Sequence, residues 1–456
     1  METQSKKDSR RVLTIIPVTA IVISSMIGTG IFTTTGLMAS LGASAGDILV
    51  AWLIGGIIAL CGALCYGEIG AALPQSGGEY YYLSRLLHPA LGFMAGCVSI
   101  IVGFAAPVAA SAMAMHLFFG RVVSGWPVRL MAVITILIVS LLHLYDVRLG
   151  SKVQTLLIAT KVMLMLTFIA SLLFGGWSGS LSFASSFNPS FWLSSSFAVV
   201  LVFISFAYSG WNAAAYIGAE VIKPERTLPR SLLLGTTVVI ALYLLVNLSY
   251  LSAMPVGELA GVAEVAHVVG EKRFGPWGGR LISAAIALTQ IVPISVMIMI
   301  GPRVLERMAR DGFMPSPFAK LSRRNIPVRA VLLQAALASL IALTSSFGPL
   351  LIFIGFTLNL FALLTVCCLF KVRRAAQSPS RICFGYPVTP IIFIAFSLWS
   401  IIWSIRSQPA AAFAGFGVLA IGYLAFLWSA RGNKKAKETE LSLAQDMPLP
   451  AQAHSE

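Results

Sequence analysis

The residues best suited to chemistry lie at the centre of the first long apolar segment, where Gly28, Thr29 and Gly30 follow one another. Glycine loosens a helix by roughly 1 kcal/mol relative to Ala, and its missing side chain lets a ligand approach the backbone closely. Unwinding inside lipid leaves N–H and C=O groups unpaired, which is tolerable only facing a cavity or a ligand. The pattern predicts either a broken helix whose second half starts at Gly30 and points its positive end at an anion, or a small-residue packing face for a neighbouring helix.

A second run of this kind, Phe206-Ala207-Tyr208-Ser209-Gly210-Trp211-Asn212, interrupts a later apolar segment. Gly28 and Ser209 each lie about 15 residues after the start of their segments, which is roughly 22 Å along a helix. Matching breaks in two helices of opposite direction are what an inverted repeat requires. The pair therefore favours a ligand site over simple helix packing.

The sequence lacks several motifs that are typical of enzymes. It contains no Gly-x-x-x-x-Gly-Lys nucleotide loop and no His-Glu-x-x-His zinc helix. The six cysteines lie in apolar segments or a basic loop without zinc-like spacing. We therefore expect no catalytic residue, no metal and no cofactor. An intramembrane hydrolase built on Ser209 is the enzyme alternative, although no base lies nearby in sequence.

The composition defines the elements that must position these residues. The chain of 456 residues is 57% hydrophobic and 11% charged, with a mean hydropathy of +0.87, so it is predicted to be an all-α polytopic membrane protein. A helix crosses a bilayer with about 20 apolar residues. Twelve such spans are predicted, near 13–39, 47–73, 90–118, 128–146, 152–175, 195–220, 232–253, 278–308, 328–346, 349–371, 387–406 and 410–430.

The distribution of positive charge predicts the orientation. Most of the 32 Lys and Arg residues fall in the tails and in the loops that share a side with them. The positive-inside rule then places both termini in the cytoplasm. The net charge of +15 needs no nucleic acid, because anionic lipid facing these loops is a sufficient partner. We expect a multi-pass protein of the inner (plasma) membrane.

Several motifs together resemble the amino acid–polyamine–organocation superfamily. They are Gly28 to Phe32, Phe206 to Asn212, Glu220, Lys223 to Arg230, Arg303 with Arg310 to Pro315, and Pro74 to Tyr80. The second of these is most similar to the L-type amino acid transporters and their prokaryotic relatives. The resemblance implies a LeuT-type fold with a 5+5 inverted repeat and broken helices 1 and 6. The core would be 13–371, with repeats 13–176 and 195–371, followed by peripheral helices in 387–430. The tails would be 1–12 and 431–456, the latter with a composition typical of disorder.

The same resemblance implies a substrate site at the two breaks. The N–H groups of Thr29, Gly30 and Ile31, with the Thr29 hydroxyl, would hold an α-carboxylate, and carbonyls freed at Met26, Phe206 and Ser209 an α-ammonium. Phe206 would gate the site or merely pack, and Asn212 would line the side-chain pocket or cap the second half-helix. The substrate-binding residues expected are Met26, Gly28, Thr29, Gly30, Ile31, Phe206, Ala207, Ser209 and Asn212.

Ionisable groups inside spans are costly and are treated as functional candidates. Lys161, about 13 Å into its span, matches a lysine that replaces sodium in sodium-independent relatives, or it snorkels to the inner surface. Its partner would be a carbonyl freed by the first break, with Ser295 the best side-chain candidate for the coupling site. Glu68 is expected at an inner gate or helix contact. Residues 74–89 are predicted to be an amphipathic inner segment whose tyrosines suit the membrane interface.

The sequence thus predicts a sodium-independent secondary transporter of neutral L-amino acids that works by alternating access. Coupling is either proton symport or amino acid exchange. The alternative substrate class is cationic amino acids or polyamines, which would require a carboxylate at mid-depth near Gly28 or Ser209. No such carboxylate is evident from the sequence.

Overall fold

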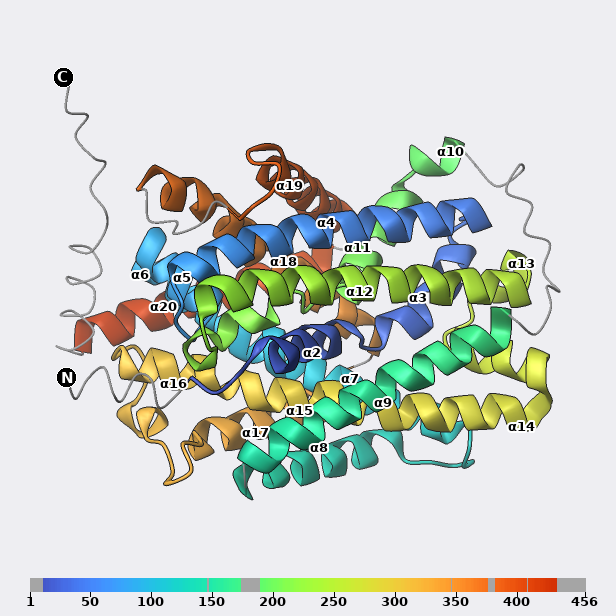
Figure 1. Cartoon of the computed structure of the whole chain (residues 1–456), viewed down its shortest axis with the longest axis horizontal. Coiled ribbons are helices and arrows are strands. Elements are labelled where there is room, and N and C mark those ends of the chain that lie inside the picture. Colours follow the sequence, from blue (N-terminus) through green and yellow to red (C-terminus); the bar gives the residue numbers. More distant parts are fainter. Residues whose placement is uncertain are drawn as a thin grey trace.

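The computed structural model describes residues 11–145, 147–173, 189–345, 347–375, 382–407 and 409–432, and these residues are almost entirely helical. Their only strand-like pairings are two isolated bridges, Leu13 with Val221 and Ser76 with Ile217. The long helices run side by side along the longest axis of the molecule (Figure 1). The sequence correctly predicts an all-helical chain.

The first half of the described chain begins with an interrupted helix and ends with two long ones. Its elements are α2 (Ile15–Met26), α3 (Gly30–Ser40), α4 (Ala45–Ala72), α5 (Glu79–Leu86), α6 (Pro89–Val98), the π-helical η1 (Ser99–Ala105), α7 (Ala106–Gly120), α8 (Val128–Tyr145) and α9 (Val147–Leu173).

The second half likewise begins with an interrupted helix. Its elements are α10 (Pro189–Trp192), α11 (Ser195–Ala207), the short 3-10 helices η3 (Ala213–Tyr216) and η4 (Gly218–Glu220), α12 (Pro224–Ala253), α13 (Val256–Leu259), α14 (Val265–Thr289), α15 (Ile291–Ile300), α16 (Pro302–Arg310), η5 (Ser316–Ala319), α17 (Val328–Thr344), α18 (Phe347–Arg374), α19 (Val388–Ser407) and α20 (Pro409–Gly432).

Five helical stretches of the described chain are long and apolar enough to cross a membrane: Ile15–Ser40, Ala45–Ala72, Pro89–Gly120, Pro224–Ala253 and Val265–Arg310. Shorter apolar helices cover most of the other predicted spans. These helices make the chain a multi-pass membrane protein. The count of twelve crossings and the repeat boundaries remain predictions, and the tails 1–10 and 433–456 lie outside the described residues.

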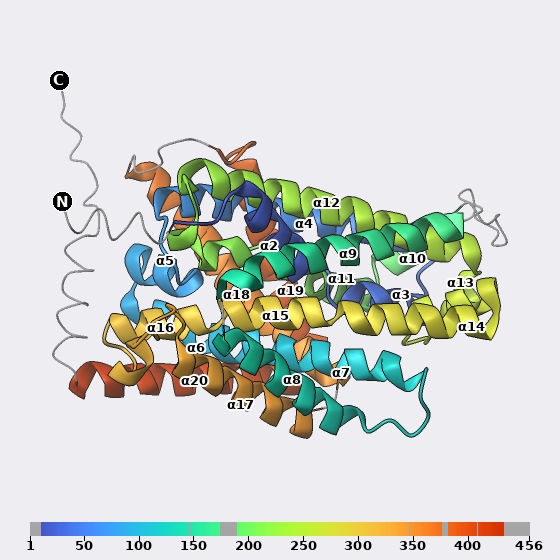
Figure 2. The ribbon, with the colours of Figure 1, turned by 60° about the horizontal axis from the view of Figure 1, so that its bottom comes forward.

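Helix α12 forms the wall behind the two breaks, since it packs along both α4 and α2. The short helices α5 and α16 lie at one end of the molecule, and α13 lies at the other, near the far end of α3 (Figure 1). A second view shows α15 crossing between α9 and α7 (Figure 2). The breaks therefore sit inside a bundle whose ends are formed by separate short elements.

One prediction about the short elements is wrong. Tyr80 and Tyr82 of α5 are fully buried, whereas the sequence analysis assigns these tyrosines to the membrane interface. Helix α5 packs against α6 and α18, so its aromatic face is covered by protein. The amphipathic pattern is real, but it faces the core of the bundle.

Candidate substrate site

The first break leaves a row of unpaired backbone donors. Helix α2 ends at Met26, Ile27 leaves the helical region with φ −75° and ψ 85°, and α3 begins at Gly30, where the sequence predicts the second half to start. Among the described residues, none accepts a hydrogen bond from the N–H groups of Thr29, Gly30 or Ile31. The first N–H groups of any helix lack an intrahelical partner and carry positive partial charge. This end of α3 is therefore suited to an anion.

The second break lies opposite the first. Helix α11 ends at Ala207, and the chain continues through a turn into η3 and η4, where a second α-helical half is replaced by short 3-10 turns. Gly210 adopts φ +98°, and a Cβ there would lie 2.5 Å from the carbonyl oxygen of Ser25. Only glycine combines this backbone conformation with so close an approach. The two breaks are thus held against each other by backbone contact.

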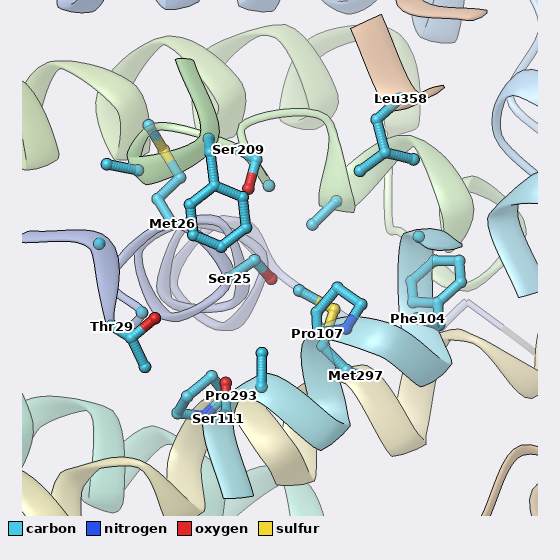
Figure 3. A pocket seen from close by; sticks show the side chains of 18 of the residues that line it. Ser25, Met26, Thr29, Phe104, Pro107, Ser111, Ser209, Pro293, Met297 and Leu358 are labelled. Atoms are coloured by element: carbon cyan, nitrogen blue, oxygen red, sulfur yellow. The ribbon is translucent and has the colours of Figure 1, made fainter. Parts of the chain in front are cut away.

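A cavity lies between the two breaks and collects most of the predicted site. Its lining includes every predicted substrate-binding residue except Ile31, namely Met26, Gly28, Thr29, Gly30, Phe206, Ala207, Ser209 and Asn212. The side chains of Ser25 on α2 and of Thr29 just before α3 face the cavity (Figure 3). Ser111 of α7 and Pro293 and Met297 of α15 close its opposite side. None of the described residues that line it carries a charged side chain.

Ser25 lines the cavity, although it was not predicted from the sequence. Its hydroxyl is buried and has no hydrogen-bond partner among the described residues. A buried hydroxyl without a partner is uncommon, because leaving a buried polar group unsatisfied costs about 1–3 kcal/mol. A ligand in the cavity would supply the missing partner.

The three carbonyls expected to hold an ammonium differ in their availability. The Met26 oxygen already accepts from the Tyr243 hydroxyl at 2.6 Å and from the Gly28 N–H at 2.8 Å. The Phe206 oxygen accepts from the N–H groups of Ser209 and Tyr208. Only the Ser209 oxygen accepts no hydrogen bond from the described residues. The expectation that all three are free is wrong, because local turns and Tyr243 occupy two of them.

Tyr243, also missed from the sequence, connects the two breaks. It is fully buried on α12, and its hydroxyl lies 2.6 Å from the Met26 oxygen and 3.0 Å from the Ala207 oxygen. A hydroxyl has one proton to donate, so the two carbonyls share it. The one signal available in the sequence was a polar-tipped aromatic at the middle of a predicted span.

The two glycines of the first break play different parts. A Cβ on Gly28 would meet nothing within 4 Å, whereas a Cβ on Gly30 would lie 2.6 Å from Ala207 Cβ and 2.7 Å from its Cα. Gly28 therefore borders open cavity. Gly30 is required by the close packing of α3 on α11, as the packing interpretation expects. The interpretation of the break as a ligand site stays a prediction.

Asn212 faces a buried carboxylate. Its Nδ2 donates to Oε1 of Glu79 at 3.0 Å, and its side chain makes no capping hydrogen bond to η3, which contradicts the capping alternative. Asn212, Phe206 and Ser209 also line a second cavity that includes Glu79. A carboxylate therefore does lie near Ser209, contrary to the sequence analysis, because α5 folds back toward the second break.

Lys161 and Ser295 are not partners. Lys161 is buried on α9, and its Nζ donates to the backbone oxygen of Ile27, a carbonyl at the first break, as expected. Snorkelling to the surface is thereby contradicted. The Ser295 hydroxyl instead lies 2.8 Å from Nε2 of His143. The pairing of Lys161 with Ser295 is wrong because α15 presents that serine to α8.

One end of the bundle, which includes α5 and α16, is tied by ion pairs. Glu68 of α4 accepts two hydrogen bonds of 2.7 Å from Arg373, and it also accepts from the N–H of Cys383. Glu220 pairs with Arg303 after the second break. The bridge between Leu13 and Val221 lies next to that pair. These contacts join the chain before α2 to the chain after the second break, and Glu68 is a helix contact.

The chain was compared with known proteins. The family model described as amino acid permease matches residues 13–427. The chain belongs to the amino acid permease family. It is 30% identical over 393 residues to the serine/threonine exchanger SteT of Bacillus subtilis (strain 168), covering 83% of this chain and 87% of that protein.

Two mammalian transporters are also similar. The large neutral amino acids transporter small subunit 2 of Mus musculus is 28% identical over 421 residues, which is 88% of this chain and 78% of that protein. The Asc-type amino acid transporter 1 of Mus musculus is 26% identical over 440 residues, or 92% of this chain and 82% of that protein. The chain is therefore an amino acid transporter of the membrane and not an enzyme. The described part of the chain contains no group of three or more His, Cys, Asp or Glu side chains that could hold a metal ion.

Proposed function

We propose that the protein transports neutral L-amino acids, which bind between the two breaks, and that it does so without sodium. The observation that carries the proposal is the row of unpaired N–H groups at Thr29, Gly30 and Ile31, at the edge of a cavity whose described lining has no charged side chain. The N-terminus of α3 and the Thr29 hydroxyl would hold the α-carboxylate.

The α-ammonium then has two acceptors within the same cavity lining. Among the described residues, none donates a hydrogen bond to the Ser209 carbonyl, and none is a partner for the buried Ser25 hydroxyl. An ammonium is a donor of three hydrogen bonds and requires such oxygen acceptors. We place the ammonium there rather than at Met26 or Phe206, whose oxygens are already occupied.

The remaining walls of the cavity favour a substrate whose side chain is uncharged. Phe104, Pro107, Ala110, Pro293, Met297 and Leu358 line the part of the cavity formed by η1, α7, α15 and α18. An apolar wall rejects a charged side chain, because moving an unpaired charge out of water is expensive. Phe206, which is half-buried and lines both cavities, would act as the gate.

Lys161 supports independence from sodium. Its ammonium group donates a hydrogen bond to the carbonyl oxygen of Ile27 at the first break. A sodium ion would need a carbonyl oxygen of this kind as a ligand. A second cation at that position would be repelled by the lysine. The contact also joins α9 to the break, so its formation and rupture would accompany the alternating opening of the two sides. We further propose that both termini are cytoplasmic, on the positive-inside rule.

Ligand analogues in a binding assay test the recognition of the backbone groups. Purified protein in detergent is titrated with serine, threonine, alanine and leucine, and with matched analogues that lack either the carboxylate or the amine. We expect the parent amino acids to raise the melting temperature and both analogue series to fail. Lysine and putrescine are included, because Glu79 lies in the neighbouring cavity. Preference for either of these over every neutral amino acid would refute the neutral assignment.

A matched pair of variants localises the carboxylate. Thr29→Val removes the hydroxyl at the first break while keeping the shape of the side chain, and we expect weaker binding by roughly tenfold, the effect of losing a hydrogen bond to a charged group. Thr160→Val changes an exposed threonine of α9 and serves as the control. Equal affinities in the two variants would remove Thr29 from the site.

A further inference from the structure

Glu79 differs from the acidic residues around it. Three other carboxylates of this end of the molecule pair with arginine, through Glu68 with Arg373, Glu220 with Arg303 and Asp311 with Arg307. Glu79 is only 2% exposed and forms no ion pair with any described residue. A buried carboxylate without a cation is expensive, whereas its neutral acid is not. This isolation favours a bound proton.

The two oxygens of Glu79 are used unequally. Oε1 accepts from the Tyr66 hydroxyl at 2.7 Å and from Asn212 Nδ2 at 3.0 Å. Oε2 makes no hydrogen bond to the described residues. In a neutral carboxylic acid, the carbonyl oxygen accepts and the other oxygen carries the proton. The observed arrangement fits an acid with its proton on Oε2.

Among the described residues, no cation forms an ion pair or a hydrogen bond with Glu79. The titratable groups that face Glu79 are the phenols of Tyr66 on α4 and Tyr216 on η3, with Tyr82 of its own helix against Tyr66. Arg307 donates to Asp311, and Asp311 also accepts from the hydroxyl of Tyr80, the residue next to Glu79 on α5. Burial raises the pKa of Glu79 to about 7, against the two hydrogen bonds, which lower it.

Asn212 connects this carboxyl to the proposed substrate site. It lines both cavities, and Glu79 lines only the second. When Glu79 is ionised, the amide of Asn212 is held by a charge-assisted hydrogen bond. Protonation weakens that bond and leaves the amide free to turn toward a ligand. Substrate and proton then favour each other, and the coupling acts equally in both directions.

We propose that Glu79 is a proton-binding site linked to the substrate cavity through Asn212, so that the protein binds its amino acid more tightly when Glu79 is protonated. This inference rests on the proposed function. Only a proton moves in the step, between Oε2 of Glu79 and water that enters the second cavity. It assigns the protein a proton-coupled cycle.

The test measures amino acid affinity of the purified full chain between pH 6 and pH 8. With a midpoint near pH 7, the protonated fraction falls from about nine-tenths to about one-tenth, so affinity should fall about tenfold if only that form binds. In Glu79→Gln we expect the pH dependence to disappear, whatever the remaining affinity. Glu258→Gln, at an exposed outer ion pair with Lys272, is the control and should keep the tenfold fall.

A second variant, Tyr66→Phe, tests the inference even if Glu79→Gln does not fold. Tyr66→Phe removes a donor that favours the ionised carboxyl, so the midpoint should move to higher pH. A purely structural role of Tyr66 would change affinity without moving the midpoint. A tenfold fall retained in Glu79→Gln, a wild type insensitive to pH, or an unmoved midpoint in Tyr66→Phe would each overturn the inference. In each of these three outcomes the protein still binds its amino acid at pH 6, so the proposed function stands. Absence of binding at every pH would instead refute the proposed function, and this inference with it.

Discussion

Gly28→Ala and Gly30→Ala add the same methyl group to glycines two residues apart, and we expect opposite consequences. At Gly30 the methyl would lie 2.6 Å from Ala207 Cβ and 2.7 Å from its Cα. Since one of these atoms is backbone, α11 itself must shift. Overpacking typically costs about 1–3 kcal/mol, which the better helix propensity of Ala offsets by at most about 1 kcal/mol. With the full offset, the net loss should be up to about 2 kcal/mol.

At Gly28 the methyl meets no atom within 4 Å, and the residue does not adopt a positive φ. Folding should be unaffected or improved by about 0.4–1 kcal/mol, because Ala has less freedom in the unfolded chain. The methyl would instead occupy the cavity beside the unpaired N–H groups. Losing one hydrogen bond to a charged carboxylate costs about 1.5–3 kcal/mol, so affinity should fall roughly 10- to 150-fold.

Thermal melting of the two purified variants, with and without a neutral amino acid, separates these effects. We expect Gly28→Ala to melt like the wild type and to lose the shift caused by substrate. Gly30→Ala should melt lower while retaining part of that shift. A Gly28→Ala variant that binds with wild-type affinity would place the carboxylate elsewhere. A Gly30→Ala variant that melts like the wild type would contradict the tight contact with Ala207.

Three further substitutions test other parts of the site. Phe206→Ala should raise KM or slow uptake by roughly tenfold, about 1.4 kcal/mol, because Phe206 lines both cavities and its truncation removes the aromatic ring that would cover the substrate; unchanged uptake kinetics would reduce Phe206 to a packing residue. Tyr243→Phe should lower the melting temperature by leaving the Ala207 oxygen without its donor among the described residues, at a cost of about 1–3 kcal/mol, and equal melting curves would contradict the bridge. Lys161→Ala should abolish most uptake, because it removes the ammonium group that binds the Ile27 carbonyl at the first break, and uptake at the wild-type rate in this variant would contradict a role for the lysine in transport.

The positions of the breaks could be predicted from the sequence, because glycine, serine and threonine at mid-span carry a cost that a plain membrane helix would avoid. The contact of Lys161 with a carbonyl of the first break was expected from the resemblance to sodium-independent relatives and from the depth of the lysine along its helix.

The missed features depend on contacts between distant segments. Tyr243 reaches Met26 across 217 positions of the chain, and Asn212 reaches Glu79 across 133. Nothing in the spacing of either residue reveals its partner. The burial of Glu79 depends on α5 folding against α6 and α18, which an amphipathic pattern cannot distinguish from a helix at the membrane surface. Such pairings are decided by tertiary packing.

The central claim, sodium-independent transport of neutral amino acids, is tested most directly by uptake into proteoliposomes that contain the purified protein. Radiolabelled serine is added outside in sodium-free buffer, with and without unlabelled amino acid inside and with and without an inward proton gradient. We predict uptake that neutral L-amino acids compete for, and that is the same when sodium is added. Uptake that requires sodium, or no uptake of any neutral amino acid under all four conditions, would contradict the account.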